Sequence, residues 1–103
     1  METIALQVEQ EWLPEGLILT LVGEITAAAA GVFPGLLDLD PWPAAILLDF
    51  GAVDYINSAG IALLINLLRQ ARSRGGELRA RGLSEHYRKI FRMVGLAEYI
   101  EIL

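Results

Sequence analysis

A nearly continuous apolar run, AILLDF at residues 45–50, leads toward a helical pattern at residues 58–76. An apolar run of this length predicts a strand that is buried on both faces. The later segment, SAGIALLINLLRQARSRGG, predicts a helix that is ended by glycine and has arginines near its C-terminus, where the helix dipole favours cations. A buried strand followed by a helix is typical of an α/β fold with a parallel sheet.

Similar signals on either side extend this pattern along the chain. Residues 4–12 alternate between apolar and polar, and the turn LPEG joins them to another apolar run, so these two strands are expected to pair as an antiparallel hairpin. In all, we expect strands at residues 4–12, 17–22, 45–50, 77–82 and 98–103.

Two further helical segments are expected. Thr26 caps one that a proline–glycine pair then interrupts, which predicts a kink or two short pieces. Residues 84–95 form an amphipathic helix that Ser84 caps and Gly95 stops. The sequence therefore predicts one α/β domain over residues 1–103, with a mostly parallel sheet of about five strands, an N-terminal antiparallel hairpin and three to four helices.

The composition favours a folded domain and excludes several classes of function. The 103 residues are 54% hydrophobic, and the absence of cysteine excludes disulfides, zinc–thiolate sites and cysteine nucleophiles. A formal net charge of −5 argues against binding to nucleic acids or to anionic lipid. No stretch is apolar over the length of a membrane-spanning helix, and the first ten residues lack the basic region of a signal peptide, so we expect neither feature.

The residue patterns of common enzymes are missing. The one histidine, His86, falls on the polar face of the last helix, and the sequence has neither a G-x-S-x-G elbow nor a glycine-rich phosphate motif. ILLDF resembles the strand of response-regulator receivers, but the acidic pair and the lysine of that fold are absent. Asp49 is therefore expected to bind backbone groups of the next loop. We expect no catalytic residue, no metal site and no cofactor.

The stretch VDYINSAGIALL at residues 53–64 places a lone serine between strand and helix. Either Asn57 or Ser58 is expected to cap the helix, which stabilises it by about 1 kcal/mol. A cap does not explain the next two residues. Ala59 leaves the approach bare, and Gly60 costs up to about 1 kcal/mol relative to alanine in a helix. The pattern predicts a surface that another protein approaches closely.

The helix that follows is apolar nearly all round. One face is expected to cover the sheet: Ile61, Leu64, Ile65 and Leu68. Leu63 is expected to project from the opposite, exposed side and to form a docking surface with Ser58.

Three segments together resemble the STAS domain, and within it the bacterial anti-sigma factor antagonists of the SpoIIAA/RsbV type. They are GEITAAAA, ILLDFGAVDYINSAGIALLINLLRQARSRGGEL and GLSEHYRKIFRMVGLAEYIEI. The resemblance as a whole runs from the first strand to Leu103. It implies a cytoplasmic, non-enzymatic switch. The antagonist sequesters an anti-sigma factor that is also a GHKL-type serine kinase, is released when that kinase phosphorylates it, and is reset by a PPM-type serine phosphatase.

By this resemblance Ser58 is the phosphorylated residue. Asn57 stands where the family usually has aspartate, and Ala59 where a second hydroxyl is common, so Ser58 is the single acceptor. The partner-binding residues that the resemblance implies are Glu24, Asn57, Ser58, Ala59, Gly60 and Leu63. It also allows a weak homodimer.

Two other hypotheses stay open. The chain is alternatively a STAS scaffold or accessory subunit without phospho-control, in a stressosome-like assembly or with a lipid-transport ATPase. A nucleotide-binding or enzymatic module is the third hypothesis, which nucleotide-dependent thermal shifts would favour.

Overall fold

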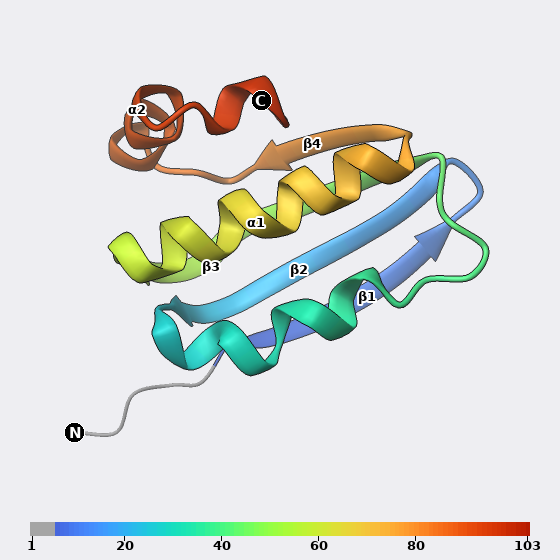
Figure 1. Ribbon diagram of the computed structural model, residues 1–103, viewed down its shortest axis with the longest axis horizontal. Coiled ribbons are helices and arrows are strands. Elements are labelled where there is room, and N and C mark those ends of the chain that lie inside the picture. The colour runs from blue at the N-terminus through green and yellow to red at the C-terminus, as the bar shows by residue number, and fades with distance from the viewer. Residues whose placement is uncertain (1–5) are drawn as a thin grey trace.

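The computed structural model describes residues 6–103 and folds them into a five-stranded sheet whose strand order follows the chain (Figure 1). The strands are β1 (Gln7–Leu13), β2 (Gly16–Ile25), β3 (Ala45–Ile56), β4 (Glu77–Arg81) and β5 (Glu101–Ile102). β1 pairs with β2 antiparallel, and every other neighbouring pair is parallel. The predicted hairpin and mostly parallel sheet are confirmed. The predicted first strand begins in residues that lie outside the described range.

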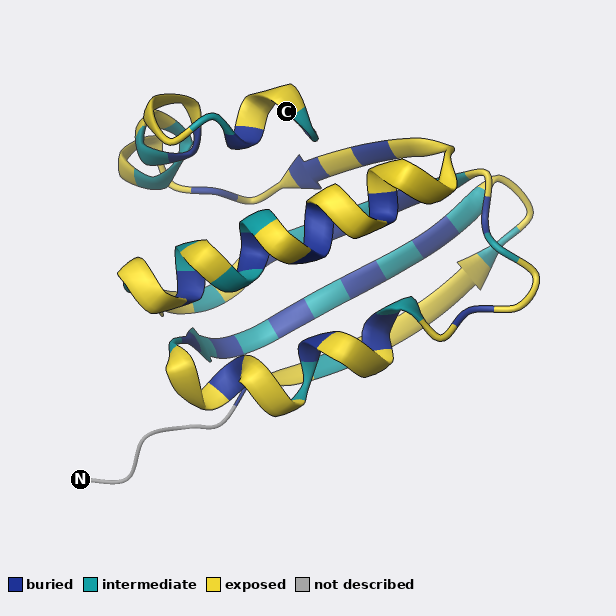
Figure 2. Ribbon diagram, in the orientation of Figure 1, coloured by how far each residue is buried: buried dark blue, intermediate teal, exposed yellow. Residues whose placement is uncertain are grey.

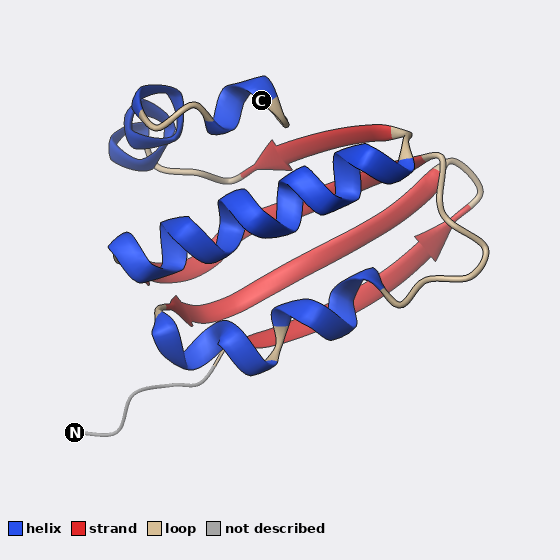
Figure 3. Cartoon of the chain, viewed as in Figure 1, coloured by secondary structure: helices blue, strands red, loops and turns tan. Residues whose placement is uncertain are grey.

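Within residues 6–103, two α-helices and three 3-10 helices connect the strands (Figure 3). The α-helices are α1 (Ser58–Arg74) and α2 (Glu85–Met93), and the 3-10 helices are η1 (Ala27–Gly31), η2 (Phe33–Leu37) and η3 (Leu96–Glu98). Thr26 caps η1 as expected, since its Oγ1 accepts from the Ala28 N–H at 3.3 Å. The proline–glycine pair reduces the expected helix to the short segments η1 and η2, so the number of α-helices is below the prediction.

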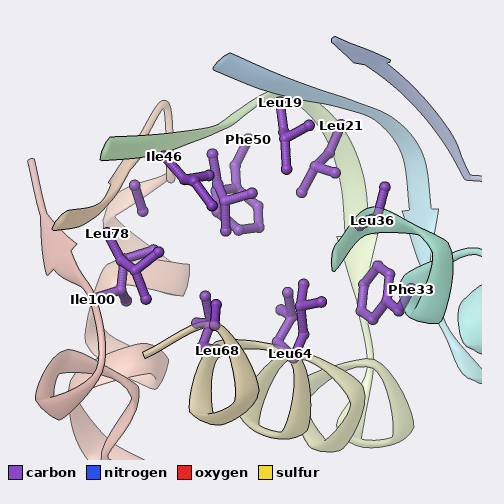
Figure 4. Packing of buried hydrophobic residues seen from close by; sticks show 14 of the residues in the cluster. Leu19, Leu21, Phe33, Leu36, Ile46, Phe50, Leu64, Leu68, Leu78 and Ile100 are labelled. Atoms are coloured by element: carbon purple, nitrogen blue, oxygen red, sulfur yellow. The ribbon is translucent and has the colours of Figure 1, made fainter. Parts of the chain in front are cut away.

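The hydrophobic core lies between the sheet and these helices. Along β2, buried residues alternate with half-buried ones, as Figure 2 shows. Leu19 and Leu21 of β2 face Leu64 and Leu68 of α1 across this core, and Phe33 of η2 closes one side of it (Figure 4). The core therefore joins one face of the sheet to the helices.

Within residues 6–103, no helix covers the other face of the sheet, which corrects the prediction that residues 45–50 are buried on both faces. Ile46, Leu48 and Phe50 are buried toward the helices, whereas Leu47 is only half-buried on the opposite side. The strands β2 to β5 succeed one another in a single direction across the sheet. Right-handed crossovers made in a single direction all return over the same face, so the opposite face stays uncovered.

Strand β3 continues six residues beyond its predicted end at Phe50. It pairs with β4 only as far as Asp49, and from there it follows β2 alone, with register shifts between Thr20 and Val22 and between Gly23 and Glu24. A bulged strand with a single neighbour loses the regular alternation of its side chains, which is why the sequence indicated a loop there. This extension brings the start of α1 beside the end of β2.

The last strand is shorter than the predicted 98–103, because only Glu101–Ile102 pair with β4. Leu96 and Ile100 are both buried, and a separation of four residues is the spacing of a helical turn. The chain therefore forms η3 before it reaches the sheet.

Candidate functional site

Helix α1 begins where strands β2 and β3 end, and Asn57 holds this junction. Its backbone N–H donates to the Ile25 carbonyl at 3.2 Å, and its side-chain Oδ1 accepts from the Gly60 N–H at 2.9 Å. Asn57 is therefore the helix cap, which resolves the choice between Asn57 and Ser58. Ser58 is the first residue of the 17-residue helix and is exposed, so its hydroxyl is not needed to hold the helix.

Gly60 is buried, and its lack of a side chain is required inside the chain. A Cβ at this position would lie 1.9 Å from the Ile25 carbonyl oxygen. The sequence-based reason for placing Gly60 on a partner surface was therefore wrong, because the surface that approaches it closely is the chain's own strand β2. A contact of Gly60 with a partner stays a prediction.

The first turn of α1 presents an electropositive end to the surface. Of its first donors, the N–H groups of Asn57 and Gly60 have the partners named above, and the Ile61 N–H donates to the Asn57 carbonyl at 2.9 Å. The N–H groups of Ser58 and Ala59, both exposed residues, lie before the first intrahelical bond. The first turn contains no acidic residue to offset the positive end of the helix dipole.

The prediction that Leu63 projects from the exposed side of α1 was wrong. It is half-buried and packs against the core. Leu63 and Arg74 share one side of the helix by their spacing, and Arg74 Nη1 donates to the Leu37 carbonyl of η2 at 3.0 Å. The predicted faces considered only the sheet as a neighbour, whereas the η1–η2 segment covers this second side. The buried stripe accordingly includes Leu67, and Ile61 lies at its margin.

Glu24 lies near Ser58 but on the other face of the sheet. It is half-buried and pairs across the strands with Tyr55, which is 47% exposed. Sequence reasoning missed Tyr55, although a large aromatic residue three positions before the lone serine was a signal for an exposed surface. The exposed residues Ser58 and Ala59 and the Glu24–Tyr55 pair thus meet at one end of the molecule.

A cleft of about 260 Å³ lies beside this end, between β3 and α2. Its lining includes Val53, Asp54, Ile56 and Tyr87. The Tyr87 hydroxyl accepts from the Ile56 N–H at 2.9 Å and so ties α2 to the end of β3. This hydrogen bond, which sequence reasoning also missed, fixes the end of β3, directly before Asn57 and Ser58.

Asp49 binds a backbone group as predicted, but that group belongs to Gly51 of β3 and not to a loop. Its Oδ1 accepts from the Gly51 N–H at 2.8 Å, and its Oδ2 lies 3.0 Å from Arg81 Nε. The Gly51 hydrogen bond, with the Arg81 guanidinium as a smaller cause, lowers the pKa of Asp49. Both carboxylate oxygens are thus engaged within the fold.

Residues 6–103 hold neither a metal-binding cluster nor a membrane-spanning helix. No group of three or more His, Cys, Asp or Glu side chains in this range is arranged to hold a metal ion. No helix in the same range combines the length and the apolar character that crossing a bilayer requires.

Comparisons with known proteins identify the family. The family model described as "Mlab, STAS domain" matches residues 8–103. A protein named anti-sigma factor antagonist BtrV, from Bordetella bronchiseptica, is 33% identical over 77% of this chain and 70% of its own length. An anti-sigma-B factor antagonist of Listeria monocytogenes is 31% identical over 80% of this chain and 74% of its own. Among solved structures, the Bacillus cell fate determinant SpoIIAA in its phosphorylated form aligns with a TM-score of 0.62 at 20% identity, over 96% of this chain and 91% of its own. The chain belongs to the STAS domain family and has anti-sigma factor antagonists among its relatives.

Proposed function

We propose that this protein is a phospho-switched antagonist that binds an anti-sigma factor kinase while Ser58 is unphosphorylated. The observation that carries the proposal is the exposed Ser58 hydroxyl at the first position of a long helix whose cap is supplied by a different residue, Asn57. Phosphorylation can therefore change this surface without removing a contact that holds the fold. The names of the curated relatives and the phosphorylated form of SpoIIAA support this function.

The local electrostatics favour a phosphate at Ser58. A phosphate adds a charge of about −1.5 to −2. The N–H groups of Ser58 and Ala59 and the positive helix end, with no acid in the first turn, stabilise such a charge by about 0.3–1 kcal/mol. Phosphorylation is accordingly expected to leave the domain folded.

The effect of phosphorylation falls on the interface instead. Around Ser58, the exposed α1 residues are Ala59 and Ala62, so the part of the surface that α1 contributes is small and uncharged. A partner fitted to it would have to desolvate a dianion after phosphorylation, without a group to pair with it. We therefore propose that the phosphate releases the kinase, and that a PPM-type phosphatase restores binding.

The test uses purified protein with a GHKL-type anti-sigma kinase from the same host. With ATP, mass spectrometry should find one phosphate, on Ser58. Ser58→Ala should remove the label and keep binding, since Asn57 still caps the helix. Ser58→Glu should weaken binding by about 100-fold or more. Asn57→Asp, which restores the usual family residue, should raise the phosphorylation rate.

The matched control is Ser73→Glu, which adds the same charge at an exposed serine near the other end of α1. It should bind as the wild type does. Equal binding by Ser58→Glu and the wild type, together with no label on Ser58 from any such kinase, would contradict the proposed switch.

The second candidate is a STAS subunit of a larger assembly without phospho-control, for example with a lipid-transport ATPase. Two observations favour it: the name Mlab in the matching family description, and Asn57 in place of the usual acid. Co-purification with an ATPase that is insensitive to Ser58→Glu would support this candidate over the first.

A further inference from the structure

The uncovered face of the sheet has an ordered pattern of charge. In one row across the strands, Glu11 of β1 pairs with Ile18, Ile18 with Leu47, and Leu47 with Arg79 of β4. Residues paired in this way point to the same side of a sheet. The row therefore runs from an acid, through two half-buried apolar side chains, to an arginine.

The next row repeats the pattern with more polar residues at its centre. Glu9 pairs with Thr20, Thr20 with Asp49, and Asp49 with Arg81. A groove of about 330 Å³ hollows the face over the same strands, and Leu13, Ile18, Leu47, Arg79 and Arg81 are among the residues that line it. The face thus has an acidic margin on β1, a hollowed centre that is apolar in the first row and polar in the second, and arginines on β4.

The arginines have neighbours within the chain but keep donors for another partner. Arg79 lies 3.1 Å from Glu77 and 3.7 Å from Glu101, in pairs whose side chains are all about half exposed or more. Exposed ion pairs of this kind contribute little to the stability of the fold, so they do not hold the Arg79 side chain tightly. Each guanidinium carries five N–H donors, of which these contacts use a minority.

We propose that this face packs against the same face of a second copy of the chain. The two copies are related by a two-fold axis that lies in the interface and runs parallel to the strands, over the line between β2 and β3. Such an axis exchanges the two margins of the face. It places Glu11 over Arg79 of the second copy and stacks Ile18 on Leu47 of the second copy, and symmetry repeats both contacts. In the next row it places Glu9 over an arginine as well.

Charge decides between this arrangement and the other two-fold arrangement. A two-fold axis perpendicular to the strands leaves β1 over β1, so the glutamates of the two copies would face one another. Like charges placed opposite each other disfavour association. The distribution of charge on the face therefore selects a second copy turned about the strand direction.

The size of the face sets the strength of the dimer. Four strands about 4.8 Å apart and five residues of about 3.3 Å rise give a patch of roughly 300 Å². This is below the area of standard stable interfaces, so the dimer is weak and depends on concentration. An axis parallel to the strands also keeps the strand direction, and the two Ser58 residues consequently lie at the same end of the dimer.

The experiment measures association of the whole chain by sedimentation equilibrium up to about 1 mM. The wild type should show a monomer–dimer equilibrium. Glu11→Arg and Arg79→Glu should each weaken it by about 10-fold or more, since each change creates two repulsive contacts in a symmetric dimer. An equimolar mixture of the two variants should associate again, because the heterodimer regains an opposite charge at both contacts.

Matched controls reverse charges on the helical side of the molecule. Asp38→Arg and Arg69→Glu, both at exposed positions, should leave the equilibrium unchanged. A dilution series of the wild type followed by NMR is a second measurement, and it does not depend on whether any variant folds. On dilution, the NMR signals of Ile18 and Leu47 should shift more than those of the exposed residues of α1. A monomer at every concentration, a dimer indifferent to the two reversals, or a mixture that fails to associate would overturn the proposal.

Discussion

Gly60→Ala should destabilise the protein, although alanine is the better helix former. The added Cβ would lie 1.9 Å from the Ile25 carbonyl oxygen and 2.7 Å from its carbonyl carbon. To reach even the 3.0 Å below which real Cβ contacts are essentially never seen, helix and strand must separate by about 1 Å. A shift of that size stretches the 3.2 Å hydrogen bond from Asn57 to Ile25 beyond bonding distance.

The magnitude follows from three terms. Overpacking of this kind costs about 1–3 kcal/mol. Loss of the hydrogen bond costs about 0.5–1.5 kcal/mol. The higher helix propensity of alanine offsets about 1 kcal/mol of this loss. The free energy of unfolding should therefore fall by about 1–3 kcal/mol, which lowers the urea midpoint by about 1 M for a chain of this size.

Urea unfolding followed by circular dichroism measures this difference. Gly31→Ala is the matched control, because Gly31 is exposed in η1 and no atom lies within 4 Å of its added Cβ. It should change the free energy of unfolding by less than about 0.5 kcal/mol. A Gly60→Ala protein as stable as the wild type, or more stable, would refute the close contact between α1 and β2.

Three other substitutions test separate parts of the fold. Trp42→Phe removes the 2.8 Å hydrogen bond from Nε1 to the Gly75 carbonyl and should lower the free energy of unfolding by about 0.5–1.5 kcal/mol, measured by thermal denaturation. Asp49→Asn should cost about 1 kcal/mol at neutral pH through the lost charge opposite Arg81. Because the folded-state pKa of Asp49 lies below the ordinary 3.8, its contribution is complete above that value and lost as the pH falls through the folded-state pKa, so wild-type and variant stabilities should converge there. Leu63→Arg should lower the free energy of unfolding by about 1–2 kcal/mol, since this side chain is half-buried. An unchanged urea midpoint would show that Leu63 is exposed.

The elements that the sequence predicted well are those with a strong, local periodicity. The helical pattern of 58–76 became α1, ended by Gly75, and that of 84–95 became α2, capped by Ser84. The pattern of α2 is one apolar stripe, that of α1 is a long run of helix-forming apolar residues, and both have caps within a few residues, so their existence needs no knowledge of distant contacts.

The parts that were missed depend on neighbours far along the chain. The one-sided cover of the sheet follows from the direction in which successive strands are added, which no local pattern records. Leu63 was placed on an exposed face because the sequence does not say that η1 and η2 lie along α1. Gly60 signalled a close approach correctly, but its partner, Ile25, is 35 residues away.

A double-mutant cycle at Asn57 and Ser58 tests whether the charge at Ser58 is accommodated by the helix end. Ser58→Glu alone should stabilise the fold by about 0.3–1 kcal/mol, because it places a negative charge beside a helix start that has no acid. Asn57→Asp keeps a capping oxygen for the Gly60 N–H, so by itself it should be tolerated. Together the two changes put neighbouring negative charges at one helix end, and their repulsion should cancel most of the gain from Ser58→Glu.

Thermal unfolding at low salt measures the stability of the wild type, the two single variants and the double variant. At high salt, the coupling energy between the two substitutions should be smaller. If Ser58→Glu alone fails to stabilise the fold at low salt, the positive end of α1 does not hold the charge. If the two effects simply add at both salt concentrations, the charges at positions 57 and 58 do not repel each other.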